Sequence, residues 1–117
     1  MITLQRVKDE ISRDPKHWRV YLMSFVDDLR YYRDTRAIIE PIELTDERTD
    51  ALLASTVEYL CDEMGLEHPA WLKRVPACSV PYFVSGFESL KAFSIVESPL
   101  RFRMRKIFVL ENFLFRV

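Results

Sequence analysis

The sequence predicts an all-α protein: a single compact domain over residues 1–117, with five or six helices and an irregular segment that contains prolines. Three observations lead to this prediction. Apolar residues recur with the period of a helix in residues 15–33 and 46–64. Capping residues and prolines stand where helices would begin. The chain has only two glycines, which is few for a β-rich protein or a phosphate loop.

The first half of the chain carries the clearest helical patterns. Thr3 is expected to cap a short helix over residues 4–12, and Asp14 with Pro15 opens a longer one over residues 15–33. The apolar stripe of the longer helix is regular, and it predicts the centre of the core. This stripe consists of Trp18, Tyr21, Leu22, Phe25, Val26, Leu29 and Tyr32.

A third helix is predicted over residues 46–64, after a less regular stretch at 34–44. Thr45 is its expected cap, and Gly65 is the expected left-handed residue at its end. Glu58 and Asp62 are four residues apart, and we interpret them as part of a solvated face. The buried stripe is predicted to be Leu53, Val57, Leu60, Cys61 and Met64.

The second half is more broken. Pro69 is expected to start a short helix, and Pro76 and Pro81 enclose an irregular loop. Ser85-Gly86-Phe87-Glu88 fits a capping box and predicts a helix over residues 86–95, with Phe87, Leu90 and Phe93 turned inward. The apolar run at 107–110 fits a strand or a buried turn, and residues 111–117 a last helical turn.

A basic stretch near the end of the chain gives the main functional hypothesis. Ser98 and Pro99 predict the start of a helix over residues 99–107, whose apolar stripe would be Leu100, Met104, Ile107 and Phe108. The remaining surface of this helix carries the positive charges of Arg101, Arg103, Arg105 and Lys106. Three interpretations stay open: a solvated face, a contact surface for an acidic protein, or a surface that contacts nucleic-acid phosphates.

The charge distribution leaves the same choice open. The net charge is −1, but residues 1–67 carry 15 acids and 9 bases, whereas residues 68–117 carry 3 acids and 8 bases. The two halves could attract each other within the fold, or present faces of opposite sign to different partners.

No pattern in the sequence predicts catalysis, a cofactor or a bound metal. His17, Cys61, His68 and Cys78 match no zinc-ligand spacing, and the signatures of nucleotide-binding loops, serine hydrolases and kinases are missing. The two cysteines, with no signal peptide or long apolar run, predict free thiols, a cytoplasmic setting and no membrane contact.

Four stretches, taken in order, resemble a known family. They are residues 50–54 leading to Gly65-Leu66, then Pro69-Ala70-Trp71, then residues 81–85, and finally residues 97–109. Together they resemble an uncharacterised helical domain of bacteria, notably actinobacteria, that often follows an N-terminal helix-turn-helix of the Xre type. The resemblance implies a regulatory or toxin–antitoxin-like setting, and it implies no catalytic residues.

The sequence therefore predicts a non-enzymatic protein-interaction or regulatory module. The alternatives are a nucleic-acid-binding regulator that uses helix 99–107 and an enzyme of unrecognised type. A protein partner is expected, and an exposed apolar patch could also make the protein a homodimer. The residues expected to contact a partner are Arg101, Arg103, Arg105 and Lys106 for polar contact, and Trp71, Tyr82 and Phe83 for apolar contact.

Overall fold

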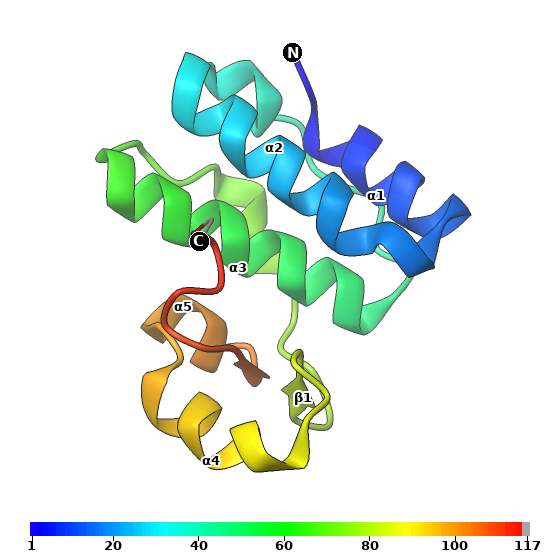
Figure 1. Ribbon diagram of the computed structural model, residues 1–117. Helices are drawn as coiled ribbons and strands as arrows, with labels where there is room; N and C mark the ends of the chain where they lie inside the picture. Colours follow the sequence, from blue (N-terminus) through cyan, green and yellow to red (C-terminus); the bar gives the residue numbers. More distant parts are fainter. Residues whose placement is uncertain (116–117) are drawn as a thin grey trace.

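The computed structural model describes residues 1–115 and shows a mostly helical fold (Figure 1). Five α-helices occur in this part of the chain: α1 (Leu4–Arg13), α2 (Trp18–Tyr32), α3 (Glu47–Met64), α4 (Glu88–Glu97) and α5 (Leu100–Arg103). Three 3-10 helices accompany them: η1 (Pro15–His17), η2 (Thr35–Ala37) and η3 (Ala70–Arg74). Two short strands, β1 (Tyr82–Phe83) and β2 (Ile107–Phe108), pair in parallel. The radius of gyration of 13.3 Å matches the value of about 13 Å expected for a compact domain of this length.

Helices α1 and α2 pack against each other and against α3. The Thr3 hydroxyl accepts a hydrogen bond from the Arg6 N–H at 3.3 Å, which confirms the predicted cap of α1. The predicted stripe of α2 is largely confirmed, because Leu22, Phe25, Val26 and Leu29 are buried. Tyr32, in the last turn of α2, is exposed, so the predicted stripe is not buried at this end of the helix.

Helix α3 runs through the middle of the molecule, with α1 and α2 on one side and α5 on the other (Figure 1). Its predicted stop at Gly65 is confirmed, with a φ of 67°. The predicted cap at Thr45 is wrong, because Asp46 occupies the N-cap position. Instead, the Thr45 N–H donates to the Asp50 carboxylate at 2.9 Å.

A buried ion pair joins α1 to α3. The Lys8 ammonium lies 2.7 Å from the Asp50 carboxylate, and both side chains are about 95% shielded from solvent. The sequence gives no sign of this pair, since Lys8 falls within an otherwise amphipathic helix. Removing one partner of such a pair strands a buried charge, so this contact ties the position of α1 to α3.

The chain after Pro76 folds differently. Strand β1 pairs with β2 in parallel, with Tyr82 opposite Ile107 and Phe83 opposite Phe108. Helices α4 and α5 form the crossover that a parallel connection requires. The apolar run at 107–110 thus begins as a strand, one of the two structures that the sequence left open.

The predicted start of α4 is wrong. The helix begins at Glu88, with Phe87 at the N-cap position and no side-chain cap. Gly86 adopts a φ of 72°, which delays the start of the helix, and the Ser85 hydroxyl bonds the Phe87 N–H at 3.4 Å instead of closing a capping box. Phe87 and Phe93, predicted to be buried, are exposed.

The predicted basic helix is also wrong in length and in orientation. Helix α5 covers only Leu100–Arg103, and Lys106 has a φ of 59° that no helix can continue through. Leu100 and Met104, members of the predicted apolar stripe, are 60% and 59% exposed, while Phe102 and Ile107 are buried. The prediction assumed one continuous helix, and the break after residue 103 changes which side faces the core.

Two further segments depart from expectation. Ser98 is not the cap of α5: it is buried, and its hydroxyl accepts a hydrogen bond from the Val109 N–H at 2.8 Å. Residues 111–115 form turns without a helix, and Phe113 and Leu114 are buried there. Residues 116–117 of the predicted last turn lie outside the described residues.

No helix in residues 1–115 combines the length and the apolar character needed to cross a membrane.

Candidate functional site

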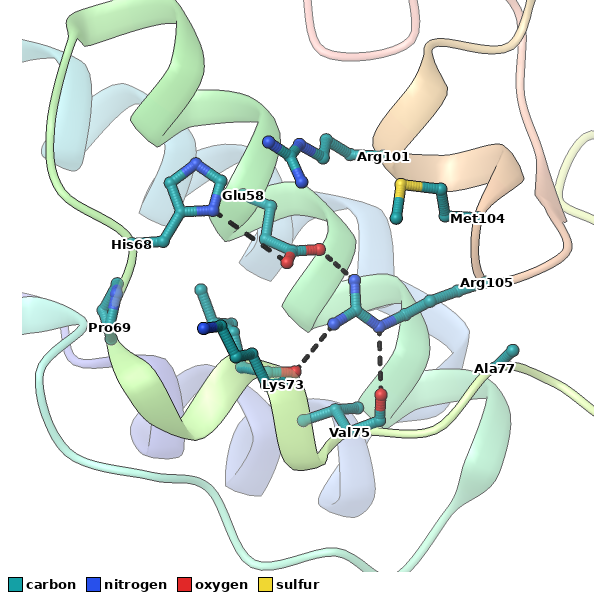
Figure 2. Close-up of a pocket in the computed structure, with 10 residues that line it drawn as sticks. Glu58, His68, Pro69, Lys73, Val75, Ala77, Arg101, Met104 and Arg105 are labelled. Carbon is teal, nitrogen blue, oxygen red and sulfur yellow. Dashed lines mark hydrogen bonds and ion pairs between the residues drawn. The ribbon is translucent and has the colours of Figure 1, made fainter.

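A cleft of about 400 Å³ opens between α3, η3 and α5 (Figure 2). Its walls mix charged and apolar side chains from three separate parts of the sequence: α3, residues 68–77 and residues 101–105. His68, Pro69 and Lys73 lie on one side and Met104 and Arg105 on the other. The lining consists of Glu58, His68, Pro69, Leu72, Lys73, Val75, Ala77, Arg101, Met104 and Arg105.

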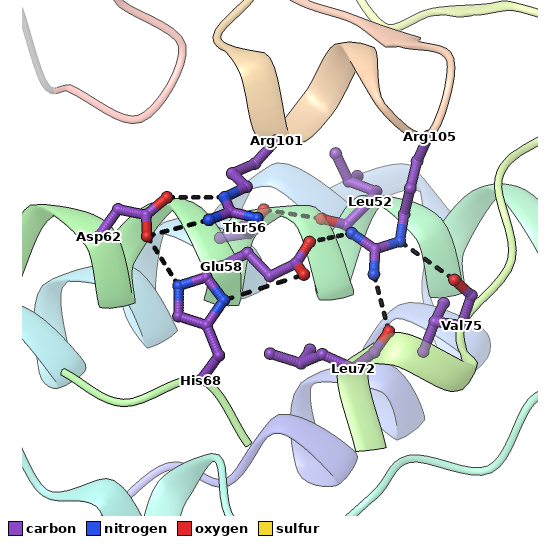
Figure 3. A network of polar contacts seen from close by, with 9 residues as sticks. All are labelled: Leu52, Thr56, Glu58, Asp62, His68, Leu72, Val75, Arg101 and Arg105. Carbon is purple, nitrogen blue, oxygen red and sulfur yellow. Dashed lines mark hydrogen bonds and ion pairs between the residues drawn. The ribbon is translucent and has the colours of Figure 1, made fainter. Parts of the chain in front are cut away.

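Arg105 is the most buried charged residue of this cleft. Its guanidinium donates to the carboxylate of Glu58, to the Leu72 carbonyl at 2.8 Å and to the Val75 carbonyl at 3.3 Å (Figure 3). All three of its nitrogens are therefore engaged within the protein. Arg105 joins α3 to η3 and to the loop that follows it, which makes it a structural residue of the cleft floor.

A second charged group lies at the cleft mouth (Figure 3). The Arg101 Nε donates to the Asp62 carboxylate at 2.7 Å, and the His68 Nε2 lies 2.7 Å from the other oxygen of the same carboxylate. The His68 Nδ1 is 4.0 Å from Glu58 Oε2, which is beyond hydrogen-bonding distance. His68 thus stands between two carboxylates and is held by one of them.

These contacts perturb the titration of Asp62 and Arg101. Burial raises the pKa of the Asp62 carboxyl, but hydrogen bonds from Arg101 and His68, and their charges, outweigh it and lower the pKa below its usual value. The hydrogen bond to Asp62 raises the pKa of Arg101 in return. Both groups are therefore held in their charged forms at neutral pH.

The structure divides the basic residues that the sequence proposed for partner contact. Arg105 is buried and Arg101 is paired with Asp62. Arg103 and Lys106 are exposed, and neither has an ion-pair partner among residues 1–115. Of the four basic residues, only Arg103 and Lys106 therefore present an unpaired positive charge at the surface among residues 1–115.

The three aromatic residues proposed for apolar contact each contact a different part of the protein. Trp71 is buried, and its indole N–H donates to the Ile38 carbonyl at 2.9 Å. Phe83 stacks on Phe108 across the two strands, with ring centroids 5.1 Å apart. Tyr82 is half-buried under the guanidinium of Arg48, 5.0 Å from its ring centroid.

The interpretation of Glu58 and Asp62 as a solvated face is wrong for Glu58, which is buried against Arg105. A usable signal did exist in the sequence. Glu58 and Asp62 are four residues apart, and so are Arg105 and Arg101, so two segments carry opposite charges at matching spacing. His68 could not be found in this way, because it lies in the connection between α3 and η3.

Cys61 and Cys78 are both free and buried, as predicted for the thiols. Burial raises the pKa of the Cys61 thiol to about 11 and raises that of Cys78 as well. Neither thiol is ionised at neutral pH, so neither is an activated nucleophile. Within residues 1–115 no three His, Cys, Asp or Glu side chains converge to hold a metal ion.

A second notable surface is the outer side of α4, which lies at the edge of the molecule farthest from α1 and α2 (Figure 1). Among its ten residues only Ser94 is buried. Phe93, Ile95 and Val96 are 58%, 50% and 80% exposed. A helix that is apolar yet uncovered is unusual on a soluble monomer, and such patches mark contact sites.

Searches among protein-family models, curated proteins and solved structures found no match to this chain.

Proposed function

We propose that this protein is a non-enzymatic protein-interaction module that associates with a second copy of itself through α4. The observation that carries the proposal is that α4 is largely exposed. Ser94 is its one buried residue, while Phe93, Ile95 and Val96 face solvent. When association removes exposed apolar surface from water, it gains about 25 cal/mol of free energy per Å² buried.

The geometry of α4 suits contact with another helix. Ala92 and Val96 lie two residues before and after Ser94, which at 3.6 residues per turn places them on the side opposite it. Phe93 and Ile95 flank this outward side. The small Ala92 side chain allows a second helix backbone to approach closely, and the larger residues on either side would enclose the contact.

The outward side of α4 favours a second copy as the occupant. Lys91 and Glu97 each lie three residues from Ser94, which places both about 60° from the buried side of the helix and away from the outward side. Ala92 and Val96 therefore form an outward side that carries no charge. This side can pack against the same side of a second copy without burying an unpaired charge.

The exposed apolar surface of α4 is large enough for a stable interface only if neighbouring residues also contribute. Aromatic side chains bury about 150–250 Å² each, so the exposed apolar residues of α4 supply a few hundred Å². A standard interface needs about 800 Å² per partner. Phe87, which precedes α4 and is exposed, and the groove lined by Leu90, Phe93 and Leu110 would supply further area. We expect a dimer of moderate affinity.

Interaction is better supported than catalysis because the polar groups of the cleft largely bind one another. It is also better supported than nucleic-acid binding, since the pairing of Arg101 with Asp62 and of Arg105 with Glu58 leaves only Arg103 and Lys106 of the basic stretch without an ion-pair partner among residues 1–115. The regulatory or toxin–antitoxin-like setting rests on the family resemblance alone and stays a prediction.

Sedimentation velocity with matched variants tests the proposal. We expect the unmodified chain to form dimers and Val96→Glu to be monomeric, because the substitution places a charge in the apolar contact. Val20→Glu is the control, since Val20 is also an exposed helical valine but lies on α2. A chain that stays monomeric at about 100 μM, where a micromolar complex would be formed, contradicts the proposal. So does equal disruption by Val20→Glu.

A further inference from the structure

We propose that the cleft between α3, η3 and α5 binds a small organic phosphate, with its phosphate group between Lys73 and Arg101 and its organic part against the apolar wall. This proposal is independent of the self-association of α4. It rests on the difference between the groups in this cleft that are fully engaged in contacts and those that are not.

Two cationic groups in the cleft have bonding capacity left over. Lys73 is exposed and makes no hydrogen bond or ion pair with any residue of the described range 1–115. Arg101 uses its Nε and Nη2 on Asp62, at 2.7 and 3.4 Å, and its Nη1 has no acceptor among the described residues. Arg105 differs, because all of its nitrogens have acceptors. The available donors are thus Lys73 and one edge of Arg101.

The balance of charge in the lining is positive. Lys73, Arg101 and Arg105 contribute three positive charges, and Glu58 in the lining and Asp62 beside Arg101 contribute two negative ones, which leaves the charge of Lys73 unbalanced. Asp62 lies at the mouth, where it holds Arg101 and His68. A phosphate dianion can form charge-assisted hydrogen bonds with the lysine ammonium and with the guanidinium at the same time. A carboxylate has a single negative charge and is attracted less strongly by the two cations.

The cleft also offers an acceptor. Oxygen Oε2 of Glu58 lies 4.0 Å from the His68 Nδ1, too far for a hydrogen bond, while Oε1 is bonded to Arg105. A hydroxyl or amine of the ligand can donate to Oε2, and the nearby His68 Nδ1 offers a second polar contact. These groups favour an organic phosphate, whose hydroxyl or amine can reach Oε2 while its phosphate group contacts Lys73 and Arg101, over inorganic phosphate.

The apolar wall defines where the rest of the ligand lies. Leu72, Val75 and Met104 line the cleft beside Arg105, and Pro69 lines the side of His68 (Figure 2). The cleft volume of about 400 Å³ falls within the range of 300–1,000 Å³ that is usual for small-molecule sites. A sugar phosphate and a nucleoside monophosphate share the required chemistry.

Titration followed by NMR tests the site on the full chain. The probes are ribose 5-phosphate, adenosine 5′-monophosphate and inorganic phosphate, at constant ionic strength, with ribose and adenosine as uncharged controls. We expect saturable shifts at His68, Lys73 and Arg101 with at least one organic phosphate, and weaker binding of inorganic phosphate. The two organic probes distinguish a sugar phosphate from a nucleotide.

Charge-neutralising variants show whether the site is specific. Lys73→Gln should reduce the affinity by about tenfold or more, since it removes a charged hydrogen bond to the ligand. Lys16→Gln is the matched control: it is also an exposed lysine without a described partner, but it lies in η1, outside the cleft. Its affinity should equal that of the unmodified chain. Both variants alter exposed side chains, so both should fold.

Three results would overturn the proposal. The first is an absence of shifts with all three phosphate probes at about 10 mM, a concentration that would reveal even millimolar binding. The second is an equal loss of affinity in Lys73→Gln and Lys16→Gln, which would indicate unspecific attraction of anions. The third is binding of inorganic phosphate as tight as that of both organic probes, which would leave the apolar wall and Glu58 without a role.

Discussion

The N-terminal helices and the segment after Pro76 obtain their structure in different ways. Helix α2 buries five residues along one side: Leu22, Met23, Phe25, Val26 and Leu29. Helix α4 is two-thirds as long and buries only Ser94. Apolar periodicity therefore predicts burial correctly for α2, which other helices cover along its length. It fails for α4, which its own chain leaves uncovered.

The C-terminal segment is attached to α3 by a few specific contacts. Phe102 inserts its ring near Tyr59 and Phe113, with centroids 6.0 Å away in both cases. Arg105 joins Glu58, and the Cys78 N–H donates to the Arg105 carbonyl at 2.9 Å. Such contacts join residues that are far apart in the sequence, so they leave no periodic pattern.

Substitution of one phenylalanine in each region is expected to give the largest difference in the free energy of unfolding. Phe25 in α2 is fully buried and Phe93 in α4 is 58% exposed. We expect Phe25→Ala to lower the free energy of unfolding by about 3–5 kcal/mol, because it removes buried area and leaves a cavity. Phe93→Ala should cost less than about 1 kcal/mol in the monomer. Urea denaturation at low protein concentration measures both.

The concentration matters because self-association through α4 would add to the apparent stability. A cost for Phe93→Ala that grows with protein concentration would agree with the proposed dimer. An equally large cost for both substitutions at low concentration would contradict the view that α4 is uncovered by its own chain.

A second pair of substitutions separates the two kinds of arginine in the basic stretch. We expect Arg105→Ala to lower the free energy of unfolding by about 3–5 kcal/mol, because it leaves the buried carboxylate of Glu58 without its partner. Arg103→Ala should change it by less than about 0.5 kcal/mol, since Arg103 is exposed and unpaired among residues 1–115. Thermal or urea unfolding of both variants provides the measurement.

Equal effects at the two positions would mean that the basic stretch behaves as one surface, as the sequence had suggested. A small effect of Arg105→Ala would show that water can reach Glu58 and replace the guanidinium. Either result would remove Arg105 from the structural contacts between α3 and the C-terminal segment.

Much of the fold could be predicted from the sequence, and the exceptions have physical causes. The cap at Thr3, the stripe of α2 and the stop at Gly65 depend on residues near one another in the chain, so local rules found them. The start of α4 and the length of α5 depended on the left-handed residues Gly86 and Lys106. A left-handed lysine has no sequence signature, because lysine rarely adopts that conformation.

The candidate site was predictable only in part. The matching spacing of Glu58 with Asp62 and of Arg101 with Arg105 could have indicated their pairing. The cleft itself depends on how η3 and α5 approach α3, and no local pattern encodes that approach. The exposed surface of α4 was misassigned because an apolar stripe on a helix looks the same in sequence whether its own chain or another copy covers it.

The smallest expected effect concerns Asp62, which joins the two regions at the surface. Its pKa is lowered in the folded protein, so its contribution to stability is present above the unfolded value of about 3.9 and is lost as the pH falls through the folded value. Asp62→Asn should therefore be less stable than the unmodified chain at pH 7. The difference should shrink below about pH 4. The carboxylate is 47% exposed, so solvent screening keeps the difference below about 1 kcal/mol.

Urea denaturation between pH 2 and pH 7 measures this dependence. Glu67→Gln is the control, because Glu67 is an exposed carboxylate in the connection that follows α3, without an ion-pair partner among the described residues. The stability difference for Asp62→Asn should also fall at high salt, since its partners are near the surface. A difference that persists unchanged at low pH would mean that Asp62 acts through neutral hydrogen bonds, and that Arg105 with Glu58 provides the charged contact between the two regions.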